Sequence, residues 1–97
     1  MTVQVSDQAT VVAASDVLAS EFGDELIILN LRDGVYYGLE DVGARIWQLL
    51  QRPISVAALR DALVTEFEVD PARCEHDVLT LLADLAGKGL VEIRGTV

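Results

Sequence analysis

The chain has 97 residues, the size of a single domain, and its 52% hydrophobic content excludes a disordered tail. It carries 16 acidic and 7 basic residues, and the net charge of −9 disfavours nucleic acids and anionic membrane surfaces as partners. One cysteine and one histidine are too few for an internal disulfide or a zinc site, so no metal is expected.

The N-terminal segment lacks the features of a targeting sequence. Residues 1–12 are interrupted by polar side chains and have no basic start, so they do not resemble a secretory signal. The apolar runs of the chain are too short to span a membrane. We therefore expect a cytoplasmic protein, with residues 1–14 as an N-terminal arm or weak edge strand and residues 15–97 as the folded domain.

Alternating apolar side chains predict three β-strands, over residues 17–22, 25–31 and 35–39. Gly23-Asp24 suits a two-residue hairpin turn with positive φ at its first residue. Asp33-Gly34 is the pair expected of a type I′ turn. The three strands are therefore expected to form an antiparallel meander.

From Asp41 onward the apolar period changes from two residues to about 3.6, which predicts helices. Ser55 is a suitable N-cap for a second helix. Asp70 followed by Pro71 marks the start of a third, longer helix. Residues 90–93 are expected to form a short closing strand.

This order of elements predicts an α+β fold, a winged helix-turn-helix in which a three-stranded antiparallel meander is followed by three helices. Trp47 lies on the apolar face of the first helix and is expected to anchor the core rather than bind a ligand. The apolar side chains expected to face the core from the second and third helices are Val56, Leu59, Leu63, Phe67, Val78, Leu79, Leu82 and Ala86.

The sequence offers no set of side chains typical of a catalytic site. Cys74 and His76 are two positions apart on a predicted helix, so they point to different faces and the thiol has no base. The carboxylates are scattered, and Gly34, Gly38 and Gly43 match no phosphate-binding fingerprint. We therefore expect a protein that is not an enzyme and that holds no metal or cofactor.

The predicted third strand, from Val35 to Leu39, is the most informative stretch for function. It contains Tyr36, Tyr37 and Gly38, but no Lys, Arg or Pro that would protect an exposed edge. At the edge of a sheet, its free N–H and C=O groups can pair with another chain. Two interpretations stay open: the edge binds a partner, or the N-terminal segment or the closing strand covers it.

A second row of side chains on the third helix lies beside those expected to face the core. It mixes apolar and acidic residues, namely Cys74, Asp77, Leu81, Asp84 and Leu85, with Lys88 at its end. A groove between this row and the third strand suits an extended peptide, with a backbone ladder on one side and carboxylates for basic side chains. The alternative is the ordinary solvated flank of a helix.

The run LNLRDGVYYGLEDVGARIWQLL, from Leu29 to Leu50, resembles the PqqD family, in which a strand, a glycine turn and an aromatic strand precede a Gly-x-x-Ile-Trp helix. The segments that fit the helical half of that family are Val69-Asp70-Pro71, Asp77-Val78, Leu81-Leu82, Leu85 and Lys88-Gly89-Leu90-Val91. Many relatives have Asn-Glu where this chain has Glu40-Asp41, a difference that affects a helix cap and not the groove.

The resemblance implies a RiPP recognition element, a small domain that captures the leader of a ribosomally synthesised precursor peptide. In this family the leader adds as a strand to the third strand and packs against the third helix, and the domain is not catalytic. The implied site comprises Gly34–Leu39 and the row from Asp77 to Leu85, with Val78. A free-standing chain of this size resembles the leader-binding subunit of lasso-peptide biosynthesis. Its implied partners are a transglutaminase-like leader peptidase and an asparagine-synthetase-like cyclase, and a radical SAM enzyme is also compatible.

Two other functions stay open on the residues alone. A winged helix can bind DNA, but residues 55–88 carry three basic and seven acidic side chains, where a DNA-reading helix needs Lys or Arg. An acidic structural domain can instead pair its exposed strand with that of a second copy, which would give a homodimer.

Overall fold

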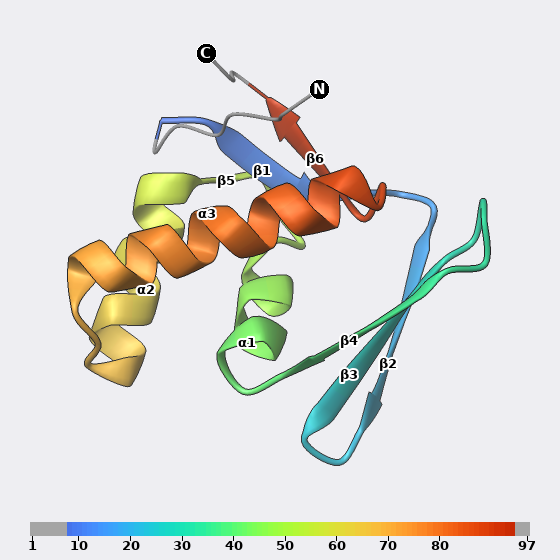
Figure 1. Ribbon diagram of the computed structural model, residues 1–97, viewed down its shortest axis with the longest axis horizontal. Helices are drawn as coiled ribbons and strands as arrows, with labels where there is room; N and C mark the ends of the chain where they lie inside the picture. Colours follow the sequence, from blue (N-terminus) through green and yellow to red (C-terminus); the bar gives the residue numbers. More distant parts are fainter. Residues whose placement is uncertain (1–7, 95–97) are drawn as a thin grey trace.

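The computed structural model describes residues 8–94, which form two three-stranded antiparallel sheets and three helices (Figure 1). The expected α+β winged helix-turn-helix is confirmed, with the meander first and the three helices after it. The second sheet, which joins segments from both ends of the described chain to a short middle segment, was not expected from the sequence.

The meander consists of β2 (Val17–Phe22), β3 (Glu25–Asn30) and β4 (Tyr36–Glu40), in the spatial order β2-β3-β4. Every second side chain of β3 is buried, namely Leu26, Ile28 and Asn30. One face of the meander therefore packs on the rest of the protein, as the alternation in the sequence predicts.

The two turns of the meander differ in how well they follow the sequence prediction. Gly23 has φ +64°, as expected for the first residue of a two-residue hairpin turn. The type I′ turn expected at Asp33-Gly34 is wrong. The Asn30 N–H donates to the Val35 carbonyl at 3.0 Å, so the loop spans residues 31–34, and only Gly34 in it has a positive φ. The Asp33 carboxylate accepts the Val35 N–H at 3.0 Å, which stabilises this longer loop.

The three helices are α1 (Val42–Leu49), α2 (Val56–Phe67) and α3 (Pro71–Gly87). Their start signals are confirmed. The Ser55 hydroxyl accepts the Ala58 N–H at 3.0 Å, and the Asp70 carboxylate accepts the Arg73 N–H at 3.0 Å. Each bond satisfies one of the N–H groups that a helix leaves unpaired in its first turn.

The segment expected to be an N-terminal arm or weak edge strand is instead the centre of the second sheet. There β1 (Thr10–Ala13) lies between β5 (Ile54–Ser55) and β6 (Val91–Arg94), while residues 1–7 lie outside the described part. Ala9 and Val11 are fully buried. A short apolar run indicates strand propensity but not which other strands pair with it. The pairing of β1 with β5 on one side and β6 on the other could therefore not be predicted from the sequence.

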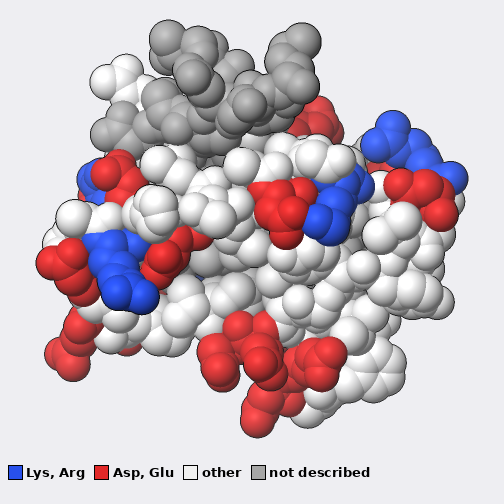
Figure 2. Space-filling view, in the orientation of Figure 1, with Lys and Arg blue, Asp and Glu red and all other residues white. Residues whose placement is uncertain are grey.

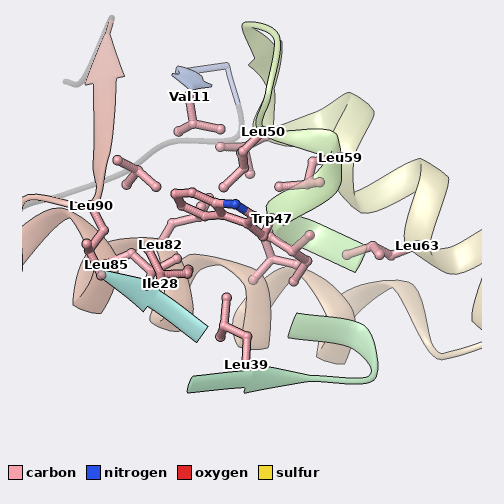
Figure 3. Packing of buried hydrophobic residues seen from close by; sticks show 14 of the residues in the cluster. Val11, Ile28, Leu39, Trp47, Leu50, Leu59, Leu63, Leu82, Leu85 and Leu90 are labelled. Atoms are coloured by element: carbon pink, nitrogen blue, oxygen red, sulfur yellow. The ribbon is translucent and has the colours of Figure 1, made fainter. Parts of the chain in front are cut away.

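The hydrophobic core lies where the helices meet the two sheets. Figure 3 shows Trp47 between Val11 of β1, Ile28 of β3 and Leu82 of α3. The indole is 5% exposed, which confirms Trp47 as a core anchor. The core thereby fixes both the meander and α3 relative to α1.

The central position of β1 predicts a specific cost for shortening one of its side chains. Val11→Ala is expected to lower the free energy of unfolding by about 2 kcal/mol, from lost transfer energy and a residual cavity. Val12→Ala, at the partly exposed next position, is the matched control and should cost under about 1 kcal/mol. Urea unfolding followed by circular dichroism measures both values, and equal small losses would contradict the core role of β1.

Candidate functional site

β4 is an edge strand of the meander, with β3 on one side and α3 near its other side (Figure 1). Among residues 8–94 no strand pairs with this edge, because β1 and β6 pair with each other in the second sheet. The interpretation in which the N-terminal segment or the closing strand covers the edge is therefore wrong for the described residues. The edge offers N–H and C=O groups to another strand.

The register shows which backbone groups of β4 face this edge. Hydrogen-bonded and non-hydrogen-bonded pairs alternate along an antiparallel ladder. The bond from the Asn30 N–H to the Val35 carbonyl fixes the phase of that alternation. Every second residue after Val35 therefore bonds to β3, and the N–H and C=O groups of Tyr36 and Gly38 point to the free edge.

The side chains of β4 alternate between two faces. Leu39 is buried and Tyr37 is partly buried, so both face the core and α3. Tyr36 is 69% exposed and, with Gly38, lies on the opposite face. The two neighbouring tyrosines therefore have different environments, as their alternation in the sequence predicts.

Tyr37 connects β4 directly to α3. Its hydroxyl donates to the Asp84 carboxylate at 2.6 Å, and the Lys88 ammonium donates to the other oxygen of that carboxylate at 2.5 Å. The Lys88 nitrogen also lies 5.2 Å from the centre of the Tyr37 ring, within reach of a cation–π interaction. These three side chains close one end of the space between β4 and α3.

The same contacts shift two pKa values. The hydrogen bond from Lys88, and then that from Tyr37, hold the pKa of Asp84 below its ordinary value. The hydrogen bond to Asp84, followed by partial burial, raises the pKa of Tyr37. The hydrogen bond therefore stabilises the fold fully between pH 3.8 and pH 10.0, the ordinary pKa values of the two groups. This contribution is lost as the pH rises through the pKa of folded Tyr37, and also as the pH falls through the pKa of folded Asp84.

A tyrosine titration tests the contact between Tyr37 and Asp84. In a Tyr36→Phe protein Tyr37 is the sole tyrosine, and its pKa is expected above 10.0. Adding Asp84→Asn removes the negative acceptor, so the pKa should fall toward 10.0. Ultraviolet absorbance of the phenolate follows both proteins, and an unchanged pKa after Asp84→Asn would argue against the contact.

A buried amide fixes the meander to the end of α3. Asn30 is 1% exposed, its Nδ2 donates to the Lys88 carbonyl at 3.0 Å, and its Oδ1 accepts the Arg32 N–H at 2.9 Å. A Cβ at Gly89 would lie 3.1 Å from the Asn30 amide nitrogen, so glycine permits this close approach. Asn30 and Tyr37 together hold the meander against the C-terminal half of α3.

A hollow of about 470 Å³ opens beside the first turn of α1, which directly follows β4. Most of its lining is apolar, and the residues come from α1, α2, the loop between α2 and α3, and α3. Those from α3 are Arg73, Cys74, Asp77, Val78 and Leu81. An apolar side chain of a bound segment fits such a concave site, with Asp77 and Arg73 at its rim.

The structure places only part of the predicted α3 row at this surface. Asp77, Leu81 and Asp84 are accessible, whereas Cys74 and Val78 reach the hollow from nearly complete burial. Leu85, also predicted to contact the peptide, is fully buried and is not among the residues that line the hollow. Because α3 packs against both α2 and β6, its buried face differs from the one predicted from the sequence. The buried side chains are Cys74, Val78, Leu82 and Leu85, while Leu79 and Ala86, predicted to face the core, are only partly buried.

Cys74 has the environment of a structural cysteine. It is 7% exposed, and its thiol lies 4.0 Å from the Arg60 carbonyl. Burial, together with the charge of Asp77, raises the pKa of the thiol, so the reactive thiolate is disfavoured. Within the described residues, no group of three or more His, Cys, Asp or Glu side chains could hold a metal ion.

Few charged side chains lie over the space between α3 and β4. In Figure 2 this part of the surface is mostly uncharged, and carboxylates gather below it, near the turn between β2 and β3 and the start of α1. A bound segment would therefore meet apolar surface first and negative charge around it. No helix of residues 8–94 has the length and hydropathy needed to cross a membrane.

Sequence reasoning missed part of the hollow. Phe67 was expected in the core but is 38% exposed and lines the hollow with Val69, and Val42 and Ile46 complete it from α1. The sequence signal that could have indicated this contribution is that two apolar residues, Phe67 and Val69, lie at the end of a predicted helix and in the loop after it. Gly34 and Val35, predicted as contacts, are exposed and directly precede β4.

The sequence model of the family described as Coenzyme PQQ synthesis protein D (PqqD) matches residues 25–91. The chain belongs to the PqqD family. Relatives named PqqA binding protein, from Rhodopseudomonas palustris strains CGA009 and BisB5, are 40% identical over 58 residues and 41% identical over 56 residues. These matches cover 59% and 57% of this chain and 57% and 55% of the relatives, so the chain spans just over half the length of the curated relatives it matches.

Two solved structures share the fold of this PqqD-family chain. One, described as TbiB1 in complex with the TbiA(beta) leader peptide, has a TM-score of 0.77 and 36% identity, and the match covers 84% of this chain and 94% of that one. The other, described as lasso peptide synthetase B1 complexed with the leader peptide, has a TM-score of 0.75 and 26% identity, with 84% and 96% covered. The resemblance seen in the sequence is thus confirmed in both family and fold.

Proposed function

We propose that this protein is a non-catalytic module that binds the leader segment of a ribosomally synthesised precursor peptide by β-strand addition to β4. The observation that carries the proposal is the free edge of β4 beside α3, with an apolar hollow at its end. In strand addition, backbone hydrogen bonds supply affinity and pockets for alternate side chains supply specificity. The two similar structures, whose descriptions name a leader peptide, support this proposal.

Within residues 8–94 the meander has a second free edge, that of β2, but it is a poorer binding site. Residues 18–22 of β2 are all exposed, and the hollow lies beside α1, the helix that β4 leads into. A strand added to β2 would gain hydrogen bonds but no apolar pocket. We therefore assign leader binding to β4.

The chemistry of the site indicates the kind of peptide it binds. Tyr36 and Gly38 present N–H and C=O groups, so the bound segment is extended. The hollow takes a bulky apolar side chain, and Leu81 lies on its wall. Asp77 at the rim favours a basic residue near that side chain.

The bound leader is then presented to a separate enzyme. The side chains around the edge of β4 bind and position, and those described in residues 8–94 supply no nucleophile–base pair or metal cluster. We propose as receiving enzymes a transglutaminase-like leader peptidase with its cyclase, or a radical SAM enzyme.

Titration with a leader peptide tests this function. The probe is a synthetic peptide that covers the N-terminal half of a short reading frame taken from the neighbourhood of this chain's gene, and calorimetry measures its dissociation constant. Saturable one-to-one binding, with protection of the β4 amides from hydrogen exchange, is the expected result. A two-fold dimer that forms through β4 and does not change on adding the peptide would overturn the proposal in favour of a dimerisation domain.

Asp77→Ala is expected to weaken leader binding by about 2–5-fold, because an exposed charge pair contributes little and is screened by solvent. The loss of this carboxylate should also make the affinity less dependent on salt. Titrations at low and high salt measure both effects. Asp61→Ala, on the exposed side of α2, is the control and should leave affinity and salt dependence unchanged.

A further inference from the structure

The face of the meander that is turned away from the helices is an unpartnered apolar surface. The register places its side chains in three cross-strand rows, which are Leu18–Leu29–Tyr36, Ser20–Ile27–Gly38 and Phe22–Glu25–Glu40. We call these nine residues the outer face. Among residues 8–94 no other element packs on it.

The outer face exposes large apolar side chains to solvent. Leu18 is 56%, Phe22 66% and Tyr36 69% exposed, and Ile27 and Leu29 are partly exposed between them. Leu31, 54% exposed, continues the patch beyond the end of β3. Contiguous apolar surface of this kind in a small acidic protein marks an interaction site.

One end of the outer face carries two carboxylates without a cation. Glu25 and Glu40 are direct cross-strand partners, and like charges in this position destabilise a sheet. No ion pair within residues 8–94 involves either of them. A Cβ at Gly38 would lie 3.2 Å from the Glu25 carboxylate and 3.7 Å from Ile27, so glycine leaves a small depression where carboxylate and apolar surface meet.

We propose that the outer face docks the enzyme that receives the leader, through a surface that is apolar at its centre and places an Arg or Lys against Glu25 and Glu40. This inference rests on the function proposed above. The charge selects the occupant, because a cation between the two carboxylates relieves their repulsion while the apolar rows bury Leu18, Leu29 and Phe22. A strand added to β4 would widen the same face, so the docked enzyme would lie next to the leader.

A second copy of the chain fits this surface poorly. In a two-fold dimer the same patch meets itself, and the outer face holds two acidic residues and no Lys or Arg. The net charge of −9 on each copy adds repulsion. The partner must therefore bring the positive charge.

The test uses the full chain and the purified enzyme proposed to receive its leader, a leader peptidase or a radical SAM enzyme, with affinity measured by surface plasmon resonance. Leu18→Thr and Phe22→Thr keep strand propensity and lie on β2, away from the leader edge. Together they are expected to weaken enzyme binding at least 10-fold. Glu25→Lys should weaken it by a similar factor, whereas the matched charge reversal Glu92→Lys on β6 should have no effect. Thermal unfolding of each variant verifies the fold.

The outcomes separate this inference from the proposed function. Leader binding within twofold of wild type in both outer-face variants, Leu18→Thr/Phe22→Thr and Glu25→Lys, with enzyme binding weakened at least 10-fold, supports the inference. Unchanged enzyme binding in the variants, or no enzyme binding by the wild type, overturns it even where the leader binds. A wild type that dimerises, and a Leu18→Thr/Phe22→Thr variant that is monomeric, overturns it in favour of a second copy. Failure of the wild type to bind the leader, with enzyme binding still sensitive to these variants, overturns the proposed function alone.

Discussion

Tyr36→Pro is expected to weaken leader binding by about 10–100-fold while the domain stays folded. The Tyr36 N–H points to the free edge, so proline removes a donor that β3 does not use and places its ring where the added strand would lie. Calorimetric titration with the leader peptide measures the loss. Thermal unfolding by circular dichroism shows that the fold persists.

Two controls make this result specific to the β4 edge. Tyr36→Val keeps the N–H and the strand propensity but removes the ring, and should change affinity far less than proline. Ala19→Pro removes the equivalent outward N–H from the opposite edge, because the bond from the Leu31 N–H to the Asp16 carbonyl fixes the same alternation along β2. Equal losses with proline at positions 19 and 36 would show that binding does not depend on β4.

Leu81→Asp is expected to reduce leader affinity by about 100-fold, because a carboxylate in the apolar hollow either stays solvated and excludes the ligand side chain or is buried without a partner. Leu81 is partly exposed in the free protein, so the free energy of unfolding should change much less than the affinity. Titration with the leader peptide and urea unfolding separate the two quantities.

His76→Asp is the matched control for this charge. It lies on the same helix, is exposed, and points about 140° around the axis from Leu81. The control should bind the leader as the wild type does. Equal weakening by both variants would show that the added negative charge acts at long range and that the hollow is not the binding site.

The ends of most elements could be predicted because they depend on near neighbours in the chain. Ser55 and Asp70 accept hydrogen bonds from N–H groups three residues later, and Gly23 has the positive φ its turn requires. The same local reasoning predicted β4 and placed its two tyrosines on opposite faces of the strand. It failed at Asp33-Gly34, where side-chain hydrogen bonds selected a longer loop.

The candidate site was predicted in part. The β4 edge and the exposed residues Asp77, Leu81 and Asp84 lie where the sequence pattern indicated. Leu85 does not, because helical periodicity defines an apolar arc but not the angle at which a neighbouring element covers it. The contribution of Phe67 to the hollow depends on how α2 ends against α3, which no local pattern encodes.

The sequence by itself determined the order and type of the elements, the acid excess and the family, because turn chemistry, capping, periodicity and motif spacing are properties of short stretches. Only the tertiary structure decided that β1 is the centre of a sheet, that β4 keeps a free edge within residues 8–94, and that Tyr37 reaches Asp84, 47 residues away. The physical reason is that strand pairing and burial depend on contacts between distant segments, whose partners are chosen by the packing of the whole core around Trp47.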